Sequence, residues 1–157
     1  MVHALSEIRR VLIPDGILID LRPMLDRWHV EVVSARETNV IGRVNDFEVG
    51  LADDTTANHA MAQAELHGWF IREREEFFPF VYSWDTPTEM EEWLAEEWND
   101  FIGWDEDSKR VARSAWAMAD GDARVQLRMK MLIARWRKVT GIRHDPFSSP
   151  GRNKSDS

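Results

Sequence analysis

The sequence has no cysteine among its 157 residues, and this absence excludes several kinds of chemistry. Disulfides, thiol nucleophiles and cysteine-based metal sites all require a residue that the chain lacks. No apolar run approaches the roughly 20 residues that a membrane-spanning helix needs. The first residues also lack the charged region and long apolar core of a signal peptide. We therefore expect a cytoplasmic protein with no membrane partner.

The sequence also lacks the common motifs that indicate catalysis or nucleotide binding. It contains no G-x-G-x-x-G loop, no Walker loop and no Gly-x-Ser-x-Gly elbow, so no phosphate cradle or nucleophile triad is expected. Its five histidines form no His-x-x-x-His or Glu-x-x-His pattern, and we expect no metal site. These are His3, His29, His59, His67 and His144. The catalytic residues stay unknown at this point.

The composition is that of a folded globular protein with an acidic surface. Hydrophobic residues make up 43% of the chain and charged residues 31%, and the net charge is −8. An acidic balance disfavours nucleic acid as a partner, because phosphate binding needs a basic surface. Eight tryptophans are many for this length, and most of them must be buried or lie at an interface.

The first elements are expected to be a helix, a tight turn and a strand. Apolar residues at helical spacing predict a helix over 4–12, which Pro14 ends. Asp15-Gly16 is a turn dipeptide, and the apolar run at 17–21 predicts a strand that is covered on both faces. Asp20 and Arg22 would lie at the carboxyl end of that strand, where open α/β sheets bind ligands. The alternative for this pair is an ordinary salt bridge.

The middle of the chain predicts a hairpin, a helix and an edge strand. Two β-rich runs within 28–44 favour the hairpin. Candidate caps at 53–55 begin a helix that runs to 67 and ends at Gly68. A strand is expected over 70–82, where Pro79 marks an edge or a bulge.

The remaining segments predict helices rich in tryptophan. Thr86, Pro87 and Glu89 form the start signal of a helix that runs to Gly103. A second helical region is expected over 105–139, with apolar residues at helical spacing. Its apolar residues include Val111, Ala115, Trp116, Ala119, Val125, Met129, Leu132 and Trp136. The two helical segments would either cover a sheet or form the surface of a homodimer or of a complex with a partner protein.

The segment "ALSEIRRVLIPDGILIDLRP" at 4–23 resembles part of the class I S-adenosylmethionine-dependent methyltransferases, of the type 11 kind. That family has a helix ending in "RVLKPGG" and then the fifth of its seven strands. Arg10, Val11, Leu12, Pro14 and Gly16 fit the pattern, whereas Ile13 and Asp15 depart from it. The helix ending in "HGWF" and the next strand follow the same order, so the resemblance covers roughly residues 3–78.

The resemblance implies that the chain is the carboxyl half of a methyltransferase. The fold expected is α/β, an incomplete Rossmann-like sheet of the later, mixed strands with an inserted hairpin and a helical C-terminal region. Residues 1–140 would form one domain, and 141–157 a disordered tail.

The family's cofactor loop precedes this segment, so no cofactor-binding residue is expected in the chain. S-adenosylmethionine would bind only if the missing half is present, and the chain alone would be inactive. Residues 23–50 and the late helices would shape the pocket for the methyl acceptor. The alternative function is a non-enzymatic interaction or dimerisation module.

Overall fold

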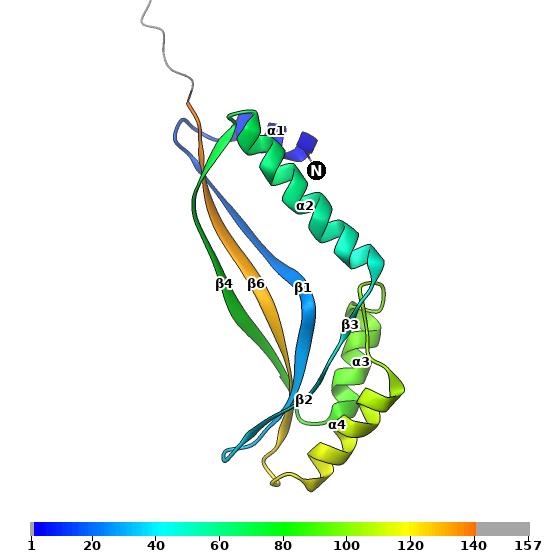
Figure 1. Ribbon diagram of the computed structural model, residues 1–157. Helices are drawn as coiled ribbons and strands as arrows, with labels where there is room; N and C mark the ends of the chain where they lie inside the picture. Colours follow the sequence, from blue (N-terminus) through cyan, green and yellow to red (C-terminus); the bar gives the residue numbers. More distant parts are fainter. Residues whose placement is uncertain (1, 141–157) are drawn as a thin grey trace, which may run out of the picture.

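The protein is built on one long, twisted sheet with helices along it (Figure 1). The computed structural model describes residues 2–140, and the tail expected at 141–157 lies outside the described residues. The helices are α1 (Val2–Val11), α2 (Glu48–Leu66), α3 (Pro87–Glu97) and α4 (Glu106–Met118). The strands are β1 (Ile17–Val33), β2 (Thr38–Arg43), β3 (Asn45–Asp46), β4 (Phe70–Trp84), β5 (Ile102–Gly103) and β6 (Arg124–Lys138).

The main sheet has the strand order β2-β1-β6-β4, and β3 pairs separately with β5. The α/β class is therefore confirmed. Each neighbouring pair in the main sheet is antiparallel, so the expected mixed pairing is wrong. The reason is that the last strand, β6, returns between β1 and β4, which themselves run in the same direction. The connection from β1 to β4 contains α2.

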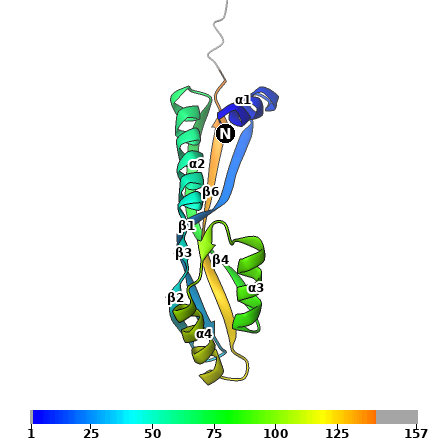
Figure 2. The same cartoon turned by 90° about the vertical axis from the view of Figure 1, so that its right-hand side faces the viewer.

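Two hydrophobic cores lie on opposite faces of this sheet, at opposite ends. The buried residues of β6 are Val125, Leu127 and Met129 in one half and Leu132, Ala134 and Trp136 in the other. Because side chains alternate between the faces of a strand, odd and even positions point to opposite sides. Helices α3 and α4 cover the first core, and α1 and α2 cover the second. Figure 2 shows these two helical groups one above the other along the strands.

The expected helix over 105–139 is wrong in its second half. Helix α4 ends at Met118, and residues 124–138 form β6. The change of face in the middle of β6 explains the error. A subset of its buried residues, at 125, 129, 132 and 136, has the spacing of one helical face although the residues belong to two faces of a strand. The first part of the expected helical C-terminal region is thus the helix α4, and its last part is the strand β6.

Strand β1 is much longer than the run at 17–21 suggests. It continues to Val33 and forms the expected hairpin with β2, which is confirmed by the pairing of His29–Val33 with β2. Its register with β6 shifts between Met24 and His29, and Arg27 there has a φ of 47°. Across this bulge, the even-numbered side chains of β1 change from the face under α2 to the face under α3 and α4.

The middle elements begin and end close to their expected places, with one exception. Helix α2 starts at Glu48, earlier than the expected position near residue 54. Its N-cap is Phe47, and Asp54 lies inside the helix, where its carboxylate accepts from the Leu25 N–H and does not cap α2. Gly68 follows this helix with a φ of 63°, as expected of a glycine at this position. Strand β4 is confirmed as an edge strand, and its bulge lies between Arg72 and Arg74 and not at Pro79.

The tryptophan-rich segments cover the sheet and do not form an exposed apolar surface. Thr86 caps α3 as expected, with its hydroxyl accepting from the Glu89 N–H at 3.2 Å. Trp93 of α3 packs on Tyr82 and Trp84 of β4, with ring centroids 4.6 and 5.2 Å apart. Each of the eight tryptophans is buried or half-buried. Within residues 2–140, no helix combines the length and apolarity that crossing a membrane requires.

The turn between α1 and β1 provides a first prediction, because Asp15 has a φ of 59°. The Gly16 N–H donates to the Ile13 carbonyl at 3.0 Å, so a tight turn places Asp15 in a conformation that glycine favours. We expect Asp15→Val to lower the free energy of unfolding by about 1–2 kcal/mol, since a β-branched side chain is strained there. Asp15→Gly should stay within about 0.5 kcal/mol of wild type. Urea unfolding measures both, and equal losses would contradict the strain.

Candidate functional site

The sequence predicted Asp20 and Arg22 at the carboxyl end of a strand. In the structure they lie within β1, which continues to Val33. Both point to the sheet face under α2 and are half-buried, and Arg22 Nε lies 3.2 Å from Asp20 Oδ1. The Arg22 guanidinium also donates to Asn58 Oδ1 of α2 at 2.6 Å. Their shared face follows from their spacing of two residues in a strand. The pair therefore joins β1 to α2, which agrees with the salt-bridge interpretation.

Arg22 also lines the cavity that best fits a small ligand, which we call the β1–α2 cavity. Its volume is about 440 Å³, within the range of roughly 300–1,000 Å³ that is common for ligand pockets. Three segments that are distant in the sequence form its wall: β1, the first half of α2, and the loop after α3. The residues that define it are Arg22, Leu25, Gly50, Asp54, Trp98 and Phe101.

Backbone capping by carboxylates shapes this cavity. Asp54 Oδ2 accepts from the Leu25 N–H at 2.8 Å, so α2 is tied directly to the bulge of β1. Asp46 Oδ2 accepts from the Arg27 N–H at 2.9 Å in the same way. Gly50 allows the close approach, because a Cβ there would lie 2.3 Å from Leu25 Cδ1. These contacts hold β1 and α2 at a fixed separation beside the cavity.

Aromatic rings form the opposite wall. The centroid of the Trp98 ring lies 5.9 Å from that of Phe101 and 4.9 Å from that of Trp28, which is fully buried. Large rings in such contacts give a rigid apolar surface. The β1–α2 cavity therefore combines an apolar wall with the charged groups of Arg22 and Asp54, which suits an apolar molecule with a polar group.

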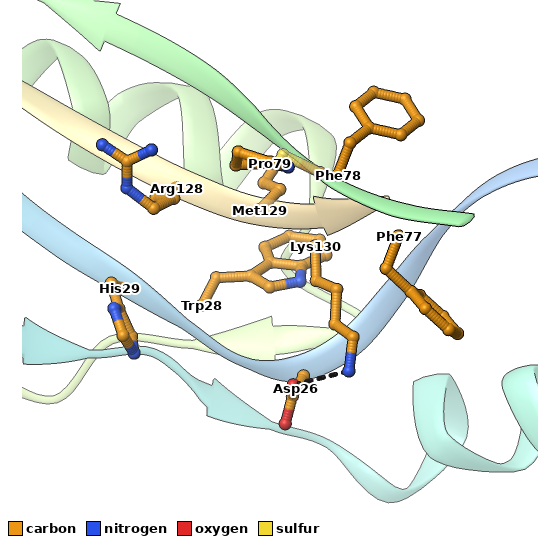
Figure 3. Close-up of a pocket in the computed structure, with 9 residues that line it drawn as sticks. All are labelled: Asp26, Trp28, His29, Phe77, Phe78, Pro79, Arg128, Met129 and Lys130. Carbon is orange, nitrogen blue, oxygen red and sulfur yellow. Dashed lines mark hydrogen bonds and ion pairs between the residues drawn. The ribbon is translucent and has the colours of Figure 1, made fainter. Parts of the chain in front are cut away.

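A second, smaller hollow of about 280 Å³ lies where β4, β6 and the bulge of β1 meet (Figure 3). Lys130 pairs with Asp26 at 3.0 Å and lies over the Phe77 ring at 4.9 Å from its centroid. Trp28 forms the floor of the hollow between the strands. Asp26 and Lys130 are paired with each other, and Arg128 is paired with Glu31, so three of the charged groups of this hollow already have partners.

One buried carboxylate lies next to this hollow. Glu31 is only 3% exposed and accepts from Arg128 Nε at 2.9 Å and Nη2 at 3.0 Å. The hydrogen bonds to Glu31 raise the pKa of Arg128 above its usual value. Arg128 thus stays charged and neutralises the buried carboxylate, which is a structural role.

Three carboxylates near these two cavities are held by other groups of the chain. Asp20, Asp54 and Glu31 each have a partner in an ion pair or a backbone hydrogen bond. A general base needs a free carboxylate or imidazole beside a nucleophile or substrate. Within residues 2–140, no three His, Asp or Glu side chains gather as a metal site would require.

Sequence reasoning located part of this site and missed the rest. Residues 23–50 and the late helices were expected to shape a pocket. Pro23, Leu25 and Gly50 of the first region line the β1–α2 cavity, and Trp98 and Phe101 of the helix expected over 86–103 line it from the loop after α3. Asp54 was one of three candidate caps of its own helix, but its carboxylate accepts from the Leu25 N–H of β1. No local pattern marks such a contact, because the two residues that it joins are 29 positions apart.

The comparisons with known proteins leave the family open. No protein-family model, no curated protein and no solved structure significantly matches this chain.

Proposed function

We propose that the chain is a methyltransferase-related protein, corresponding to the C-terminal part of a class I S-adenosylmethionine-dependent enzyme and inactive by itself. The observation that carries the proposal is the arrangement of the first elements. Helix α1 leads into β1, and after β2 and β3 helix α2 leads into β4, which runs in the same direction as β1 with β6 between them. Strands that run in one direction and are joined through a helix are the unit of Rossmann-like sheets.

The edge of β1 supports the same proposal. Residues 17–24 pair with β6 on one side only, because β2 joins β1 from His29 onward. A further strand before α1 would continue the sheet along this edge, with α1 as its connecting helix. The cofactor-binding segment would belong to that preceding part.

The β1–α2 cavity is then the place for the methyl acceptor. The resemblance assigns acceptor binding to 23–50 and to the late helices. Residues of 23–50 contribute to the wall of this cavity, as do Trp98 and Phe101 of the helix expected over 86–103. Its aromatic side would hold the apolar body of the acceptor, while Arg22 and Asp54 would orient its polar group. S-adenosylmethionine would supply the methyl group when the upstream part is present.

A direct prediction concerns the isolated 157-residue chain. We expect titration calorimetry to show no binding of S-adenosylmethionine, because the chain has no glycine-rich cofactor loop. Incubation with methyl-labelled S-adenosylmethionine and a cell extract should transfer no label. Transfer above that of a heat-denatured sample would contradict the assignment of an inactive part.

The intact mass of the protein in its source cells tests the relation to a full enzyme. An antibody against residues 85–102 would isolate it for mass spectrometry. A mass well above 18.3 kDa would support a longer enzyme that includes the cofactor segment. A mass near 18.3 kDa would argue against methyl transfer and favour the second function.

That second function is a non-enzymatic interaction or dimerisation module. Its specific support is the pair of exposed apolar side chains Ile19 and Leu21, beside the unpaired edge of β1. Apolar side chains next to free backbone groups favour the binding of another strand. Sedimentation that shows only monomers would count against this function.

A further inference from the structure

The open edge of β1 offers unpaired backbone groups to a partner strand. The Lys138 N–H donates to the Gly16 carbonyl at 2.9 Å, so the even-numbered residues of this half of β1 bond to β6. In an antiparallel ladder, the residues between them point their N–H and C=O groups to the other side. Ile17, Ile19 and Leu21 therefore direct these groups outward, and the described chain places no strand against them.

The open stretch has a defined end. Pro23, the next residue facing outward, has no N–H. Beyond it, the carboxylates of Asp54 and Asp46 already accept from the N–H groups of Leu25 and Arg27. A partner strand can therefore pair with residues 17–23 but not further along β1.

A second open edge of the sheet, along the edge strand β4, carries features that prevent such pairing. Strand β4 has a bulge after Arg72, and Pro79 interrupts its N–H groups. Charged residues fill positions 72–76. Bulges, proline and charges are the usual protections of edge strands. From Ile17 to Leu21 the edge of β1 has none of them except Asp20, whose charge Arg22 neutralises.

We propose that this edge pairs with the same edge of a second copy of the chain, antiparallel and about a two-fold axis at Leu21. A two-fold axis preserves the faces of the sheet, so each residue must oppose one of the same parity. An axis at any residue from Leu18 to Arg22 meets this condition, and each choice places different side chains opposite each other. An axis at Asp20 or at Arg22 would place two like charges opposite each other, which weakens a pairing. The result is an eight-stranded sheet across two chains, twice the four strands of one.

Charge complementarity selects Leu21. An axis there places Asp20 opposite Arg22 of the second copy, and Arg22 opposite its Asp20. Leu18 would face Met24 of the second copy, which extends the apolar contact. An axis at Ile19 would instead place Asp20 opposite Leu18, where a carboxylate gains no partner. Opposite charges across strands stabilise a pairing, and like charges weaken it.

The pairing also covers apolar side chains that are otherwise exposed. Ile19 and Leu21 are 50% and 56% exposed on the sheet face that lacks α1 and α2. Next to the axis, Leu21 of each copy would contact Leu21 of the other. This inference rests on the second proposed function and names the surface and the partner.

Sedimentation equilibrium of the full chain tests the pairing. We expect wild type to have twice the monomer mass of 18.3 kDa. Leu21→Lys would place two like charges at the axis and should raise the dissociation constant at least roughly tenfold. Ile71→Lys is the matched control, because Ile71 is also 56% exposed but lies on β4. It should leave the dissociation constant within about twofold of wild type.

A charge exchange tests the register. Asp20→Arg and Arg22→Asp each place like charges opposite each other in a homodimer, so each variant should sediment mainly as a monomer. A mixture of the two restores opposite charges at both positions and should form the dimer. Circular dichroism checks that each variant is folded; if either is unfolded, Leu21→Lys decides.

The outcomes separate this inference from the function on which it rests. A dimer that Leu21→Lys does not weaken would overturn the edge pairing and leave the dimerisation module in place. Monomeric wild type would overturn both. Dimers of the single charge variants as stable as their mixture would overturn the axis at Leu21.

Discussion

Trp28→Ala should lower the free energy of unfolding by about 3–5 kcal/mol, the range for removing a large buried aromatic side chain. Trp28 is 2% exposed and lies at the bulge where β1 changes from one core to the other. Its Nε1 donates to the Met24 carbonyl at 2.7 Å, and its ring meets Trp98 edge to face at 4.9 Å. The substitution would remove the packing and leave this carbonyl without its donor.

Urea unfolding followed by far-ultraviolet circular dichroism measures this loss. Trp28→Phe separates the two contributions, because it keeps most of the apolar volume and should lose only about 1–2 kcal/mol. Met118→Ala is the exposed control, at 83% exposure, and should change the stability by less than about 0.5 kcal/mol. A loss below about 1 kcal/mol for Trp28→Ala would show that the bulge does not depend on this side chain.

Arg128→Met should lower the free energy of unfolding by about 2–3 kcal/mol. Arg128 is the partner of Glu31, and removing one member of a buried pair leaves an uncompensated charge. The expected loss is at the lower end of that effect because the Arg128 side chain is 39% exposed and water can reach it. The double variant Arg128→Met with Glu31→Gln should recover at least half of the loss, since it removes the charge.

The control for this pair lies on the same strand. Arg124 pairs with Asp85 at 3.1 Å, and both side chains are well exposed, so Arg124→Met should cost less than about 1 kcal/mol. Equal losses for Arg124→Met and Arg128→Met would contradict the role of burial.

The contribution of the Glu31–Arg128 pair to the free energy of unfolding should depend on pH through the pKa of Arg128. The hydrogen bonds to Glu31 raise the pKa of Arg128 above its usual value. A raised pKa stabilises the folded state below the unfolded value and loses that contribution only as the pH rises through the folded value. The contribution of Arg128 should therefore be constant through the neutral range.

Local chemistry made the first and the best-capped elements predictable. Pro14 and Gly16 define the turn before β1, Gly68 follows α2 with a positive φ, and Thr86 caps α3. Each of these signals acts within a few residues, so it is the same in any surrounding structure. The hairpin of β1 and β2 is predictable for the same reason, because its two runs are neighbours in the chain.

The candidate site was less accessible to such reasoning. Asp20 and Arg22 could be named from the sequence, but their burial under α2 and the contact with Asn58 could not. The β1–α2 cavity joins segments near residues 25, 54 and 98, and its shape depends on the contact between Asp54 and the Leu25 N–H. Contacts between residues so far apart in the sequence produce no periodic pattern that could be recognised in the sequence.

Strand β6 shows where the sequence pattern ends and the assembled fold takes over. From the sequence, 124–138 was expected to continue a helix, because Val125, Met129, Leu132 and Trp136 have helical spacing. Which residues are buried depends on two sets of helices that cover opposite faces at opposite ends. The helices that cover β6 come from distant segments of the chain. The sequence of 124–138 alone therefore could not show that its buried residues lie on two faces of a strand. Burial belongs to the packed molecule, whereas turns and caps belong to the local chain.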